Sequence, residues 1–222
     1  MLPKELWEKF VHGLPAESVP EIILDSWQRS KQAGVDHESP AFRRIASEDL
    51  QALLLAHEEL IRDVLPELQR LSSFLPKPNV VYLVDPDGTV LHAISTHPDM
   101  IEKYCLAPGF IWSEKAMGTN GAGTALISKK PVAVIGCAHF CAAWHDAACL
   151  ASPLFGVQGA VVGAIDATIP APAALPLHLA EVVRSALEVE RHLRSDEAGQ
   201  KPVAQSSGSR SRSARRHLQR ST

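Results

Sequence analysis

Residues 137–149, with the sequence CAHFCAAWHDAAC, hold three of the four cysteines and two of the ten histidines in the chain. Thiolate and imidazole groups bind zinc, copper(I) or iron, and such thiols also serve as redox-responsive groups. Cys141, His145 and Cys149 follow at four-residue intervals, so they would share one face if the segment were one helix. The segment lacks the Cys-x-x-Cys pairs common in structural zinc sites, and Cys149 is expected to lie already in the next strand.

Three interpretations of this segment stay open. Free cysteine is among the most buried residue types, which favours packing in a pocket or core without a cofactor. A redox-responsive thiol is the second interpretation. The third is a zinc or iron site, whose ligands would be Cys137, His139, Cys141, His145 and Cys149.

Residues 116–124, AMGTNGAGT, form a glycine-rich stretch whose backbone could approach an anion. A phosphate loop of the Walker type would end in Gly-Lys-Ser/Thr, whereas Thr124 is followed by Ala-Leu. We therefore expect a helix running to Lys129, capped by Thr119 or Asn120 and lying close to a sheet or a ligand. Its N-terminus would attract a carboxylate or another small anion.

No catalytic motif accompanies these residues. The sequence has no nucleophile elbow, no His-Glu-x-x-His, no Walker lysine and no convincing pair of carboxylates in a loop. A cysteine near a histidine arises easily by chance among four cysteines and ten histidines. We expect a protein that is not an enzyme.

The composition is typical of a globular protein with one core. The chain has 222 residues and 45% hydrophobic content, enough for one domain with helical additions. It has no run of eighteen apolar residues and no secretory signal, so we expect no membrane contact and a cytoplasmic location. The cysteines should then be reduced thiols.

Charge divides the chain unevenly. Six of the 22 Lys and Arg lie in residues 201–222, and all 25 Asp and Glu precede that stretch. An acidic body offers no footprint for nucleic acid, so a contact with nucleic acid or an acidic partner is expected only through the Arg/Ser-rich tail. We expect this tail, residues 196–222, to be disordered.

Helical patterns dominate the first third of the chain. Residues 4–12 and 19–33 predict two short amphipathic helices, the second ending at Gly34. A long helix is expected from an N-cap at Ser47 to about residue 75. Pro66 removes a backbone donor within it and predicts a kink or break near residues 63–65.

Strand patterns follow from residue 79 onward. Apolar runs on either side of residues 85–88 predict a hairpin, and a second pair of strands should flank a turn at 156–159. A helix at 98–106 and a strand at 131–136 lie between the pairs. The helix at 175–194 should be a surface or dimer helix, and its repeated apolar residues are Leu179, Val183, Ala186, Leu187 and Leu193. Antiparallel strands with helices at both ends indicate an α+β fold.

Several ordered blocks of the sequence resemble one known family. The blocks are DSWQRSKQAGVD, VVYLVDPDGTVLHAI, GFIWSEKAMGTNGAGTAL and the stretch from PVAVIG to GAIDAT. Together they cover residues 20–195 and look like the N-terminal sensory region of bacterial enhancer-binding transcription activators of the acetoin-regulator type. That region contains a GAF domain.

The resemblance implies a GAF-like antiparallel sheet of about six strands, with the N- and C-terminal helices packed on one face. The opposite face would carry a small-molecule cavity roofed by residues 105–120 and 137–149. Family members pass the signal through the C-terminal helix to an AAA+ ATPase module and a helix-turn-helix domain. Neither module is recognisable in this sequence, so we expect a sensory fragment, or a protein that works through a partner carrying the output module.

We therefore expect a sensor of a small-molecule effector in bacterial transcriptional regulation, dimeric through its terminal helices. Its pocket residues would supply aromatic walls, polar tips and a helix N-terminus, and they are Trp112, Thr119, Asn120, His139, Phe140, Trp144, His145 and Cys149. The alternatives are a metal or redox sensor and a structural dimerisation module. The expected parts are a helical extension (1–46), a long helix (47–75), the sensor domain (76–195) and the tail (196–222).

Overall fold

The structure is a computed structural model that describes residues 1–199, so most of the expected tail, from residue 200 onward, lies outside the described residues. The helices, including two short 3-10 turns, are α1 (Lys4–Val11), α2 (Glu21–Gln32), α3 (Ser47–Ala56), α4 (Glu58–Phe74), α5 (Pro98–Lys103), α6 (Glu114–Met117), α7 (Gly121–Ser128), η1 (Ala142–Trp144), η2 (Ala171–Ala173) and α8 (Pro176–Gly199).

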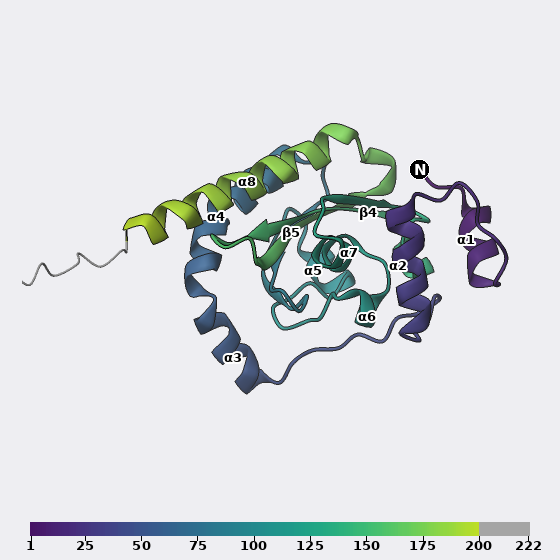
Figure 1. The fold of residues 1–222 in the computed structure, drawn as a ribbon, viewed down its shortest axis with the longest axis horizontal. Helices are drawn as coiled ribbons and strands as arrows, with labels where there is room; N and C mark the ends of the chain where they lie inside the picture. The colour runs from purple at the N-terminus through teal and green to yellow at the C-terminus, as the bar shows by residue number, and fades with distance from the viewer. Residues whose placement is uncertain (200–222) are drawn as a thin grey trace, which may run out of the picture.

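The strands form one antiparallel sheet between two layers of helices (Figure 1). They are β1 (Val80–Val84), β2 (Val90–Ser95), β3 (Val132–Ile135), β4 (Ala147–Phe155) and β5 (Val161–Pro170), in the order β2-β1-β5-β4-β3. The two predicted hairpins, β1–β2 and β4–β5, are confirmed. The sheet has five strands where about six were expected.

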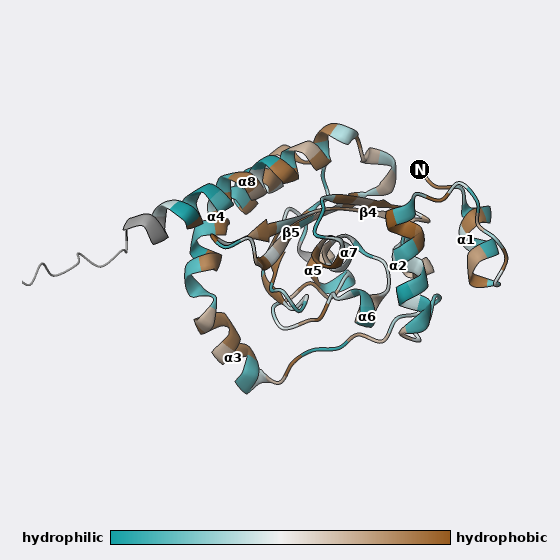
Figure 2. Ribbon diagram, viewed as in Figure 1, coloured by the Kyte–Doolittle hydropathy of each residue, from teal (hydrophilic) through white to brown (hydrophobic). Residues whose placement is uncertain are grey.

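Strand alternation divides the core into two halves, because successive side chains point to opposite faces of a sheet. Val81 and Leu83 of β1 face α4 and α8, whereas Val80, Tyr82 and Val84 face the other layer. We call the first side the outer face and the second the inner face. The hydrophobic colouring of β4 and β5 along their length agrees with burial on both sides (Figure 2).

On the outer face, α4 and α8 lie against the sheet as expected. The buried seam of α8 consists of Val182, Ala186 and Val189, with Leu179 and Leu193 partly buried beside it. Two residues of the predicted apolar series lie outside this seam: Leu187 is 55% exposed and Val183 is half-buried. Each of the two lies about 100° around the helix from a residue of the seam, so its side chain does not point at the sheet.

The predicted long helix is two helices. The break falls at His57, which separates α3 from α4, and not near residues 63–65. The Nδ1 atom of His57 lies 2.9 Å from the Leu53 carbonyl oxygen, so the side chain competes with backbone N–H groups for this acceptor of the helix. Pro66 is tolerated inside α4 because that helix is held against the sheet by Leu60, Val64, Leu68 and Leu71. Ser47 begins α3, but Ala46 occupies the N-cap and no side chain caps it.

The first two helices lie on the inner face, opposite α4 and α8. The expected packing of terminal helices on one face therefore holds for α4 and α8 and not for α1 and α2. Trp7 of α1 and Trp27 of α2 belong to the inner core, and α2 runs beside α6 and α7 (Figure 1). Each indole N–H donates a 2.8 Å hydrogen bond to a carbonyl oxygen of the segment 137–145, which ties both helices to that segment.

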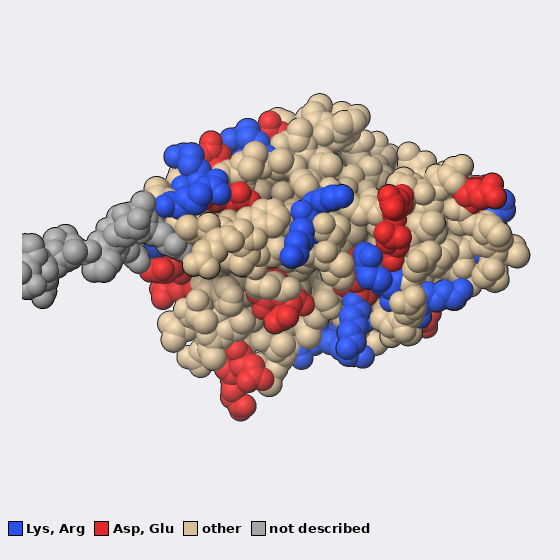
Figure 3. All heavy atoms as spheres, viewed as in Figure 1, with Lys and Arg blue, Asp and Glu red and all other residues tan. Residues whose placement is uncertain are grey.

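Within residues 1–199, no helix is both long enough and apolar enough to cross a membrane. Acidic and basic side chains are interspersed over the face seen in Figure 3, with wide uncharged areas between them. That face therefore shows no single-sign patch of the kind that attracts nucleic acid.

Candidate effector site on the inner face of the sheet

A group of buried polar side chains lies at the centre of the inner face. Tyr82 of β1 and Asp166 of β5 are cross-strand partners, and both are fully buried. Cys149 of β4 and Thr168 of β5 form the next pair on the same face, with Sγ and Oγ1 3.4 Å apart. Among the described residues, the Tyr82 hydroxyl and both Asp166 carboxylate oxygens have no hydrogen-bond partner.

The environment of Asp166 favours its neutral form. Burial raises the pKa of the Asp166 carboxyl to about 7. The Tyr82 hydroxyl and the Ala122 N–H lie close enough to oppose this shift, although neither has the geometry of a hydrogen bond to the carboxyl. The carboxyl sits at the N-terminus of α7, where a side chain at Gly121 would collide with Oδ2 of Asp166. The predicted attraction of this helix end for a carboxylate is thus met by the chain's own Asp166.

An aromatic wall adjoins these polar groups. The Trp112 ring lies 6.5 Å from the Tyr82 ring and 5.4 Å from the Trp144 ring, measured between centroids. Tyr104 lies 5.8 Å from Trp144 on the far side. The Trp112 indole donates to the Cys105 carbonyl, whereas the Trp144 indole N–H is buried without a partner in the described chain. We call Tyr82, Trp112, Trp144, Cys149 and Asp166 the inner cluster.

The predicted helix cap at Asn120 is confirmed, and it has a structural function. The Asn120 side chain accepts a 2.8 Å hydrogen bond from the Gly123 N–H and donates to the Gly118 carbonyl. It therefore closes the first turn of α7. The predicted pocket residue Asn120 thus shapes the helix beside the inner cluster.

Thr119 belongs to a second buried polar group, beneath α2. Its hydroxyl shares a 2.7 Å hydrogen bond with the Ser26 hydroxyl, and Glu114 accepts two hydrogen bonds from Arg29 at 2.7 and 2.9 Å. Glu114 is 1% exposed, so its charge is compensated inside the protein by Arg29 and Ser26. This group fastens α2 to α6 and α7, and it places Thr119 away from any described opening.

The cysteines and histidines of 137–149 are dispersed because the segment is not a helix. It consists of turns, the short η1 and the start of β4, so the four-residue spacing does not create a common face. Cys137 Sγ lies 3.5 Å from Nδ1 of His145, Cys141 donates to the Asp36 carbonyl, and Cys149 lies in β4 as expected. Across residues 1–199, no three His, Cys, Asp or Glu side chains come together to hold a metal ion.

Burial keeps the thiols and imidazoles of this segment neutral. It raises the pKa of Cys141 to about 12 and that of Cys149 further, and it lowers the pKa of His139 to about 4. His139 is fully buried, and its Nδ1 lies 3.0 Å from the Gly136 carbonyl oxygen. Neutral, buried thiols react slowly, which is the behaviour of packing residues.

The structure brings together three of the eight predicted pocket residues, Trp112, Trp144 and Cys149. Phe140 and His145 lie under α1 instead, where Trp7 donates to the Phe140 carbonyl and stacks edge-on against the His145 ring. The residues that the prediction missed are Tyr82, Tyr104 and Asp166. A signal for Asp166 existed, because a lone carboxylate alternates with apolar residues in the strand AVVGAIDAT.

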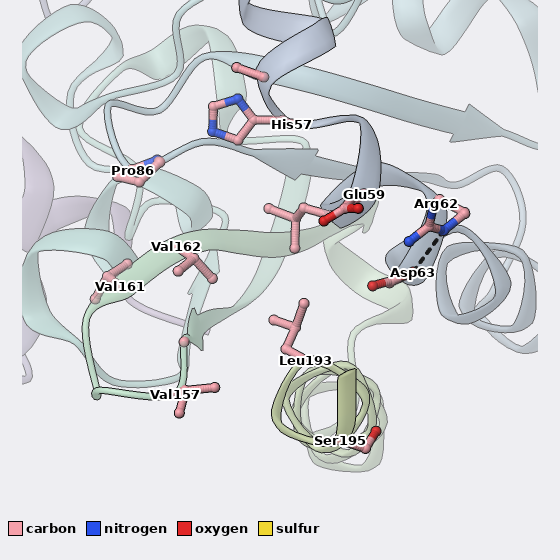
Figure 4. Close-up of a pocket in the computed structure, with 13 residues that line it drawn as sticks. His57, Glu59, Arg62, Asp63, Pro86, Val157, Val161, Val162, Leu193 and Ser195 are labelled. Atoms are coloured by element: carbon pink, nitrogen blue, oxygen red, sulfur yellow. Dashed lines mark hydrogen bonds and ion pairs between the residues drawn. The ribbon is translucent and has the colours of Figure 1, made fainter. Parts of the chain in front are cut away.

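Among residues 1–199, the three best-formed surface pockets have none of the eight predicted residues in their lining. The largest, about 720 Å³, lies on the outer side between the start of α4, the end of α8 and the β4–β5 turn (Figure 4). Leu193, Val161 and Val162 line it, with Glu59 and the Arg62–Asp63 pair at its rim. It is separated from the inner cluster by the sheet.

Comparison with known proteins matches most of the described chain. A family model described as MimR, N-terminal domain, matches residues 7–190. The acetoin dehydrogenase operon transcriptional activator AcoR of Bacillus subtilis is 31% identical over 203 residues, covering 86% of this chain and 33% of that protein. The propane 2-monooxygenase operon transcriptional activator MimR of Mycolicibacterium smegmatis is 28% identical over 188 residues, covering 82% and 31%.

The chain therefore spans about a third of the length of these curated relatives. Among solved structures, the E. coli DhaR(N)–DhaL complex matches with a TM-score of 0.75 at 19% identity, covering 81% of this chain and 62% of the matched chain. This likeness shows the GAF-like α+β fold that the sequence predicted.

Proposed function

This chain belongs to the family of MimR N-terminal domains, and on that premise we propose that it senses a small uncharged effector, bound at the inner cluster, for a transcriptional activator. The observation that carries the proposal is the set of buried polar groups without partners at the inner cluster: the Tyr82 hydroxyl, the Asp166 carboxylate and the Trp144 indole N–H. Buried polar groups are costly unless something satisfies them, and a bound effector would do so.

The chemistry of these groups favours an uncharged effector with a hydroxyl or carbonyl oxygen. Asp166 and Tyr82 offer acceptors for a hydroxyl, and the Trp144 N–H offers a donor to an oxygen. An acid would bring a negative charge into a buried site that already favours the neutral form of a carboxyl group, which is unfavourable. The names of the relatives agree with an uncharged effector, since they contain acetoin dehydrogenase and propane 2-monooxygenase operons, and both acetoin and propane are small and uncharged; of the two, only acetoin carries the hydroxyl and carbonyl oxygens that these groups would bind.

The outer face supplies the route for output. Ile165 and Ala167 flank Asp166 in β5 and pack in the outer core with Val182, Ala186 and Val189 of α8. A ligand that favours one position of β5 would therefore shift the equilibrium position of α8. Because the relatives are about three times longer, we propose that α8 leads the signal to an output module, carried by the same protein or by a partner.

A protein partner and a homodimer are also part of the proposal. DhaR(N) was solved in complex with DhaL, which makes a partner protein one form that the output takes. Leu177 and Leu187 of α8 are 48% and 55% exposed, and they would be covered in a dimer formed through α8. Light scattering of the purified chain, with Leu187→Lys as the variant, tests the dimer: a monomeric wild-type protein would exclude it.

The ligand proposal is tested by calorimetry with matched compounds. Butane-2,3-diol, 3-hydroxybutan-2-one and propan-2-ol represent the uncharged class, and lactate and isopropylamine are charged compounds of similar size. We expect at least one uncharged compound to bind the wild-type protein and to bind Asp166→Asn at least about tenfold more weakly, because the amide lacks the O–H of the neutral carboxyl and is a weaker acceptor than the ionised form. Asp49→Asn, a change on the exposed side of α3, is the control and should bind normally.

Two results would contradict this proposal. One is the absence of binding by any uncharged compound of the panel, extended to aldehydes, phenols and further ketones. The other is equal binding by the wild-type protein and Asp166→Asn, which would place the effector away from the inner cluster.

A further inference from the structure

We propose that the small pocket between α5 and the start of β4 is the entrance to the inner cluster, and that Tyr104 with the Lys103–Asp146 ion pair forms its gate. This inference rests on the proposed function, because an entrance matters only if something enters. The gate itself is defined by contacts that are present without any ligand.

The pocket has a volume of about 260 Å³ and lies at one end of the sheet. β2 and β5 finish at this end, and β1 and β4 begin there. Its lining residues come from these strand ends and from α5, and they are Pro78, His97, Asp99, Met100, Lys103, Tyr104, Asp146 and Pro170. The pocket therefore opens between the sheet and a helix of only six residues.

Tyr104 belongs both to the lining of this pocket and to the aromatic wall of the inner cluster. It is 6% exposed, and its ring lies 5.8 Å from the ring of Trp144. Burial raises the pKa of the Tyr104 phenol. Rotation of Tyr104 would connect the pocket to Trp144 and, through it, to the rest of the inner cluster.

A network of polar contacts holds Tyr104 in the closed position. Lys103 Nζ lies 2.6 Å from Oδ2 of Asp146 and donates to the Tyr104 hydroxyl at 3.1 Å. The Tyr104 hydroxyl in turn donates to Oδ1 of Asp146 at 3.5 Å, and Nζ of Lys103 lies 4.7 Å from the centroid of the Tyr104 ring. The ion pair thus bridges α5 and the segment before β4, with the Tyr104 hydroxyl between them.

Opening the site at Tyr104 costs less free energy than opening it by lifting the segment 137–145, which we call the roof. That roof is tied to the N-terminal segment by the two indole hydrogen bonds of Trp7 and Trp27 and by the Ala142 N–H, which donates to the His37 carbonyl at 2.7 Å. Lifting it would break several hydrogen bonds, two of them buried. The Lys103 and Asp146 side chains are 54% and 56% exposed, so water replaces their contact at small cost.

Cys149 provides a reporter of opening that needs no ligand. It is 3% exposed and lies in the inner cluster, and burial raises the pKa of its thiol, so a thiol reagent reacts only when the site opens. The experiment uses the full chain carrying Cys105→Ser, Cys137→Ser and Cys141→Ala. It measures the rate of Cys149 modification by methyl methanethiosulfonate, with mass spectrometry of the unmutated chain as a check.

We expect Lys103→Met and Asp146→Asn each to speed the modification of Cys149 by about two- to fivefold, the range that an exposed ion pair supports. The double variant should react no faster than the faster single variant, since both changes remove one interaction. Tyr104→Ala should give a larger increase, of at least about tenfold, because the ring that closes the gate is removed. The control is Arg191→Met, which breaks the exposed Arg191–Glu188 pair on α8 and should leave the rate unchanged.

Unchanged rates in Lys103→Met and Asp146→Asn, or a rate that follows only the global stability in urea, would overturn the gate. So would an increase confined to Trp7→Phe and Trp27→Phe, since that result would place the opening at the roof. These outcomes are separate from failure of the proposed function. If no effector binds while the gate variants behave as expected, the sensing proposal falls and the gate remains.

Discussion

Tyr82 and Asp166 face each other across β1 and β5 on the inner face of the sheet, each fully buried and without a hydrogen-bond partner among the described residues. A carboxyl group in this setting is a source of pH dependence, a constraint on neighbouring residues and an anchor for a ligand. The first two consequences can be measured on the protein alone.

The Asp166 carboxyl should make the free energy of unfolding fall as the pH rises. Its pKa is raised from 3.8 to about 7 in the folded protein, so the folded state holds the proton more tightly. The stabilisation is complete below about pH 4 and is lost as the pH rises to about 7. For this one group the loss is up to about 4 kcal/mol.

The comparison of wild type with Asp166→Asn by urea unfolding isolates this effect. His139, with a pKa of about 4 in the folded protein, produces the opposite slope below about pH 6.5, and the difference between the two proteins cancels it. The stability of the variant relative to wild type should increase between pH 4 and 7 and then level off. A constant difference over that range would show that Asp166 titrates normally.

Gly121→Ala should destabilise the protein although it places alanine in a helix. Alanine normally favours a helix over glycine by about 1 kcal/mol, but here the new methyl group would collide with Asp166 and lie 2.8 Å from Cβ of Cys149. We expect a net loss of about 1–3 kcal/mol in thermal or urea unfolding. The double variant Gly121→Ala/Asp166→Ala should cost less than the sum of the single changes, and strict additivity would exclude the contact.

Arg29→Met should cost more stability than Glu114→Gln. The first change leaves the Glu114 carboxylate buried without its cation, which costs about 3–5 kcal/mol. The second leaves Arg29 without its anion, but the Arg29 side chain is 36% exposed and water can solvate it. Arg29→Met/Glu114→Gln should recover part of the loss. Hydrogen exchange of α2 is the local readout, and unchanged protection there in Arg29→Met would mean that the pair does not fasten the helix.

Substitutions on α8 should distinguish the seam from its neighbours. Val189→Ala removes methyl groups from the outer core and should cost about 1–2 kcal/mol, whereas Leu187→Ala, on the exposed side, should change stability by less than about 0.5 kcal/mol. Urea unfolding at low protein concentration keeps association out of the measurement. A large effect of Leu187→Ala under those conditions would mean that this residue is covered.

Local patterns in the sequence determined the elements and much of the fold. Apolar, β-rich runs on either side of turn residues predicted both hairpins, the Asn120 cap predicted α7, and Gly34, with a φ of 72°, ended α2 where expected. These features depend on residues close to one another in the chain, so spacing and residue type are sufficient. The resemblance to sensory regions of transcription activators was likewise confirmed by the family match.

The composition of the site was decided by the tertiary structure. The spacing of Cys141, His145 and Cys149 would give a shared face only in a helix, and the segment is turn and strand because Cys141 and Ala142 bond to the N-terminal segment and β4 begins at Ala147. Asp166 follows Gly121 by 45 positions in the sequence, and the two residues are in contact only because the sheet packs against α7. Contacts between distant segments depend on how the helices pack against the faces of the sheet. The residues next to Asp166 or Cys149 in the sequence therefore do not predict them.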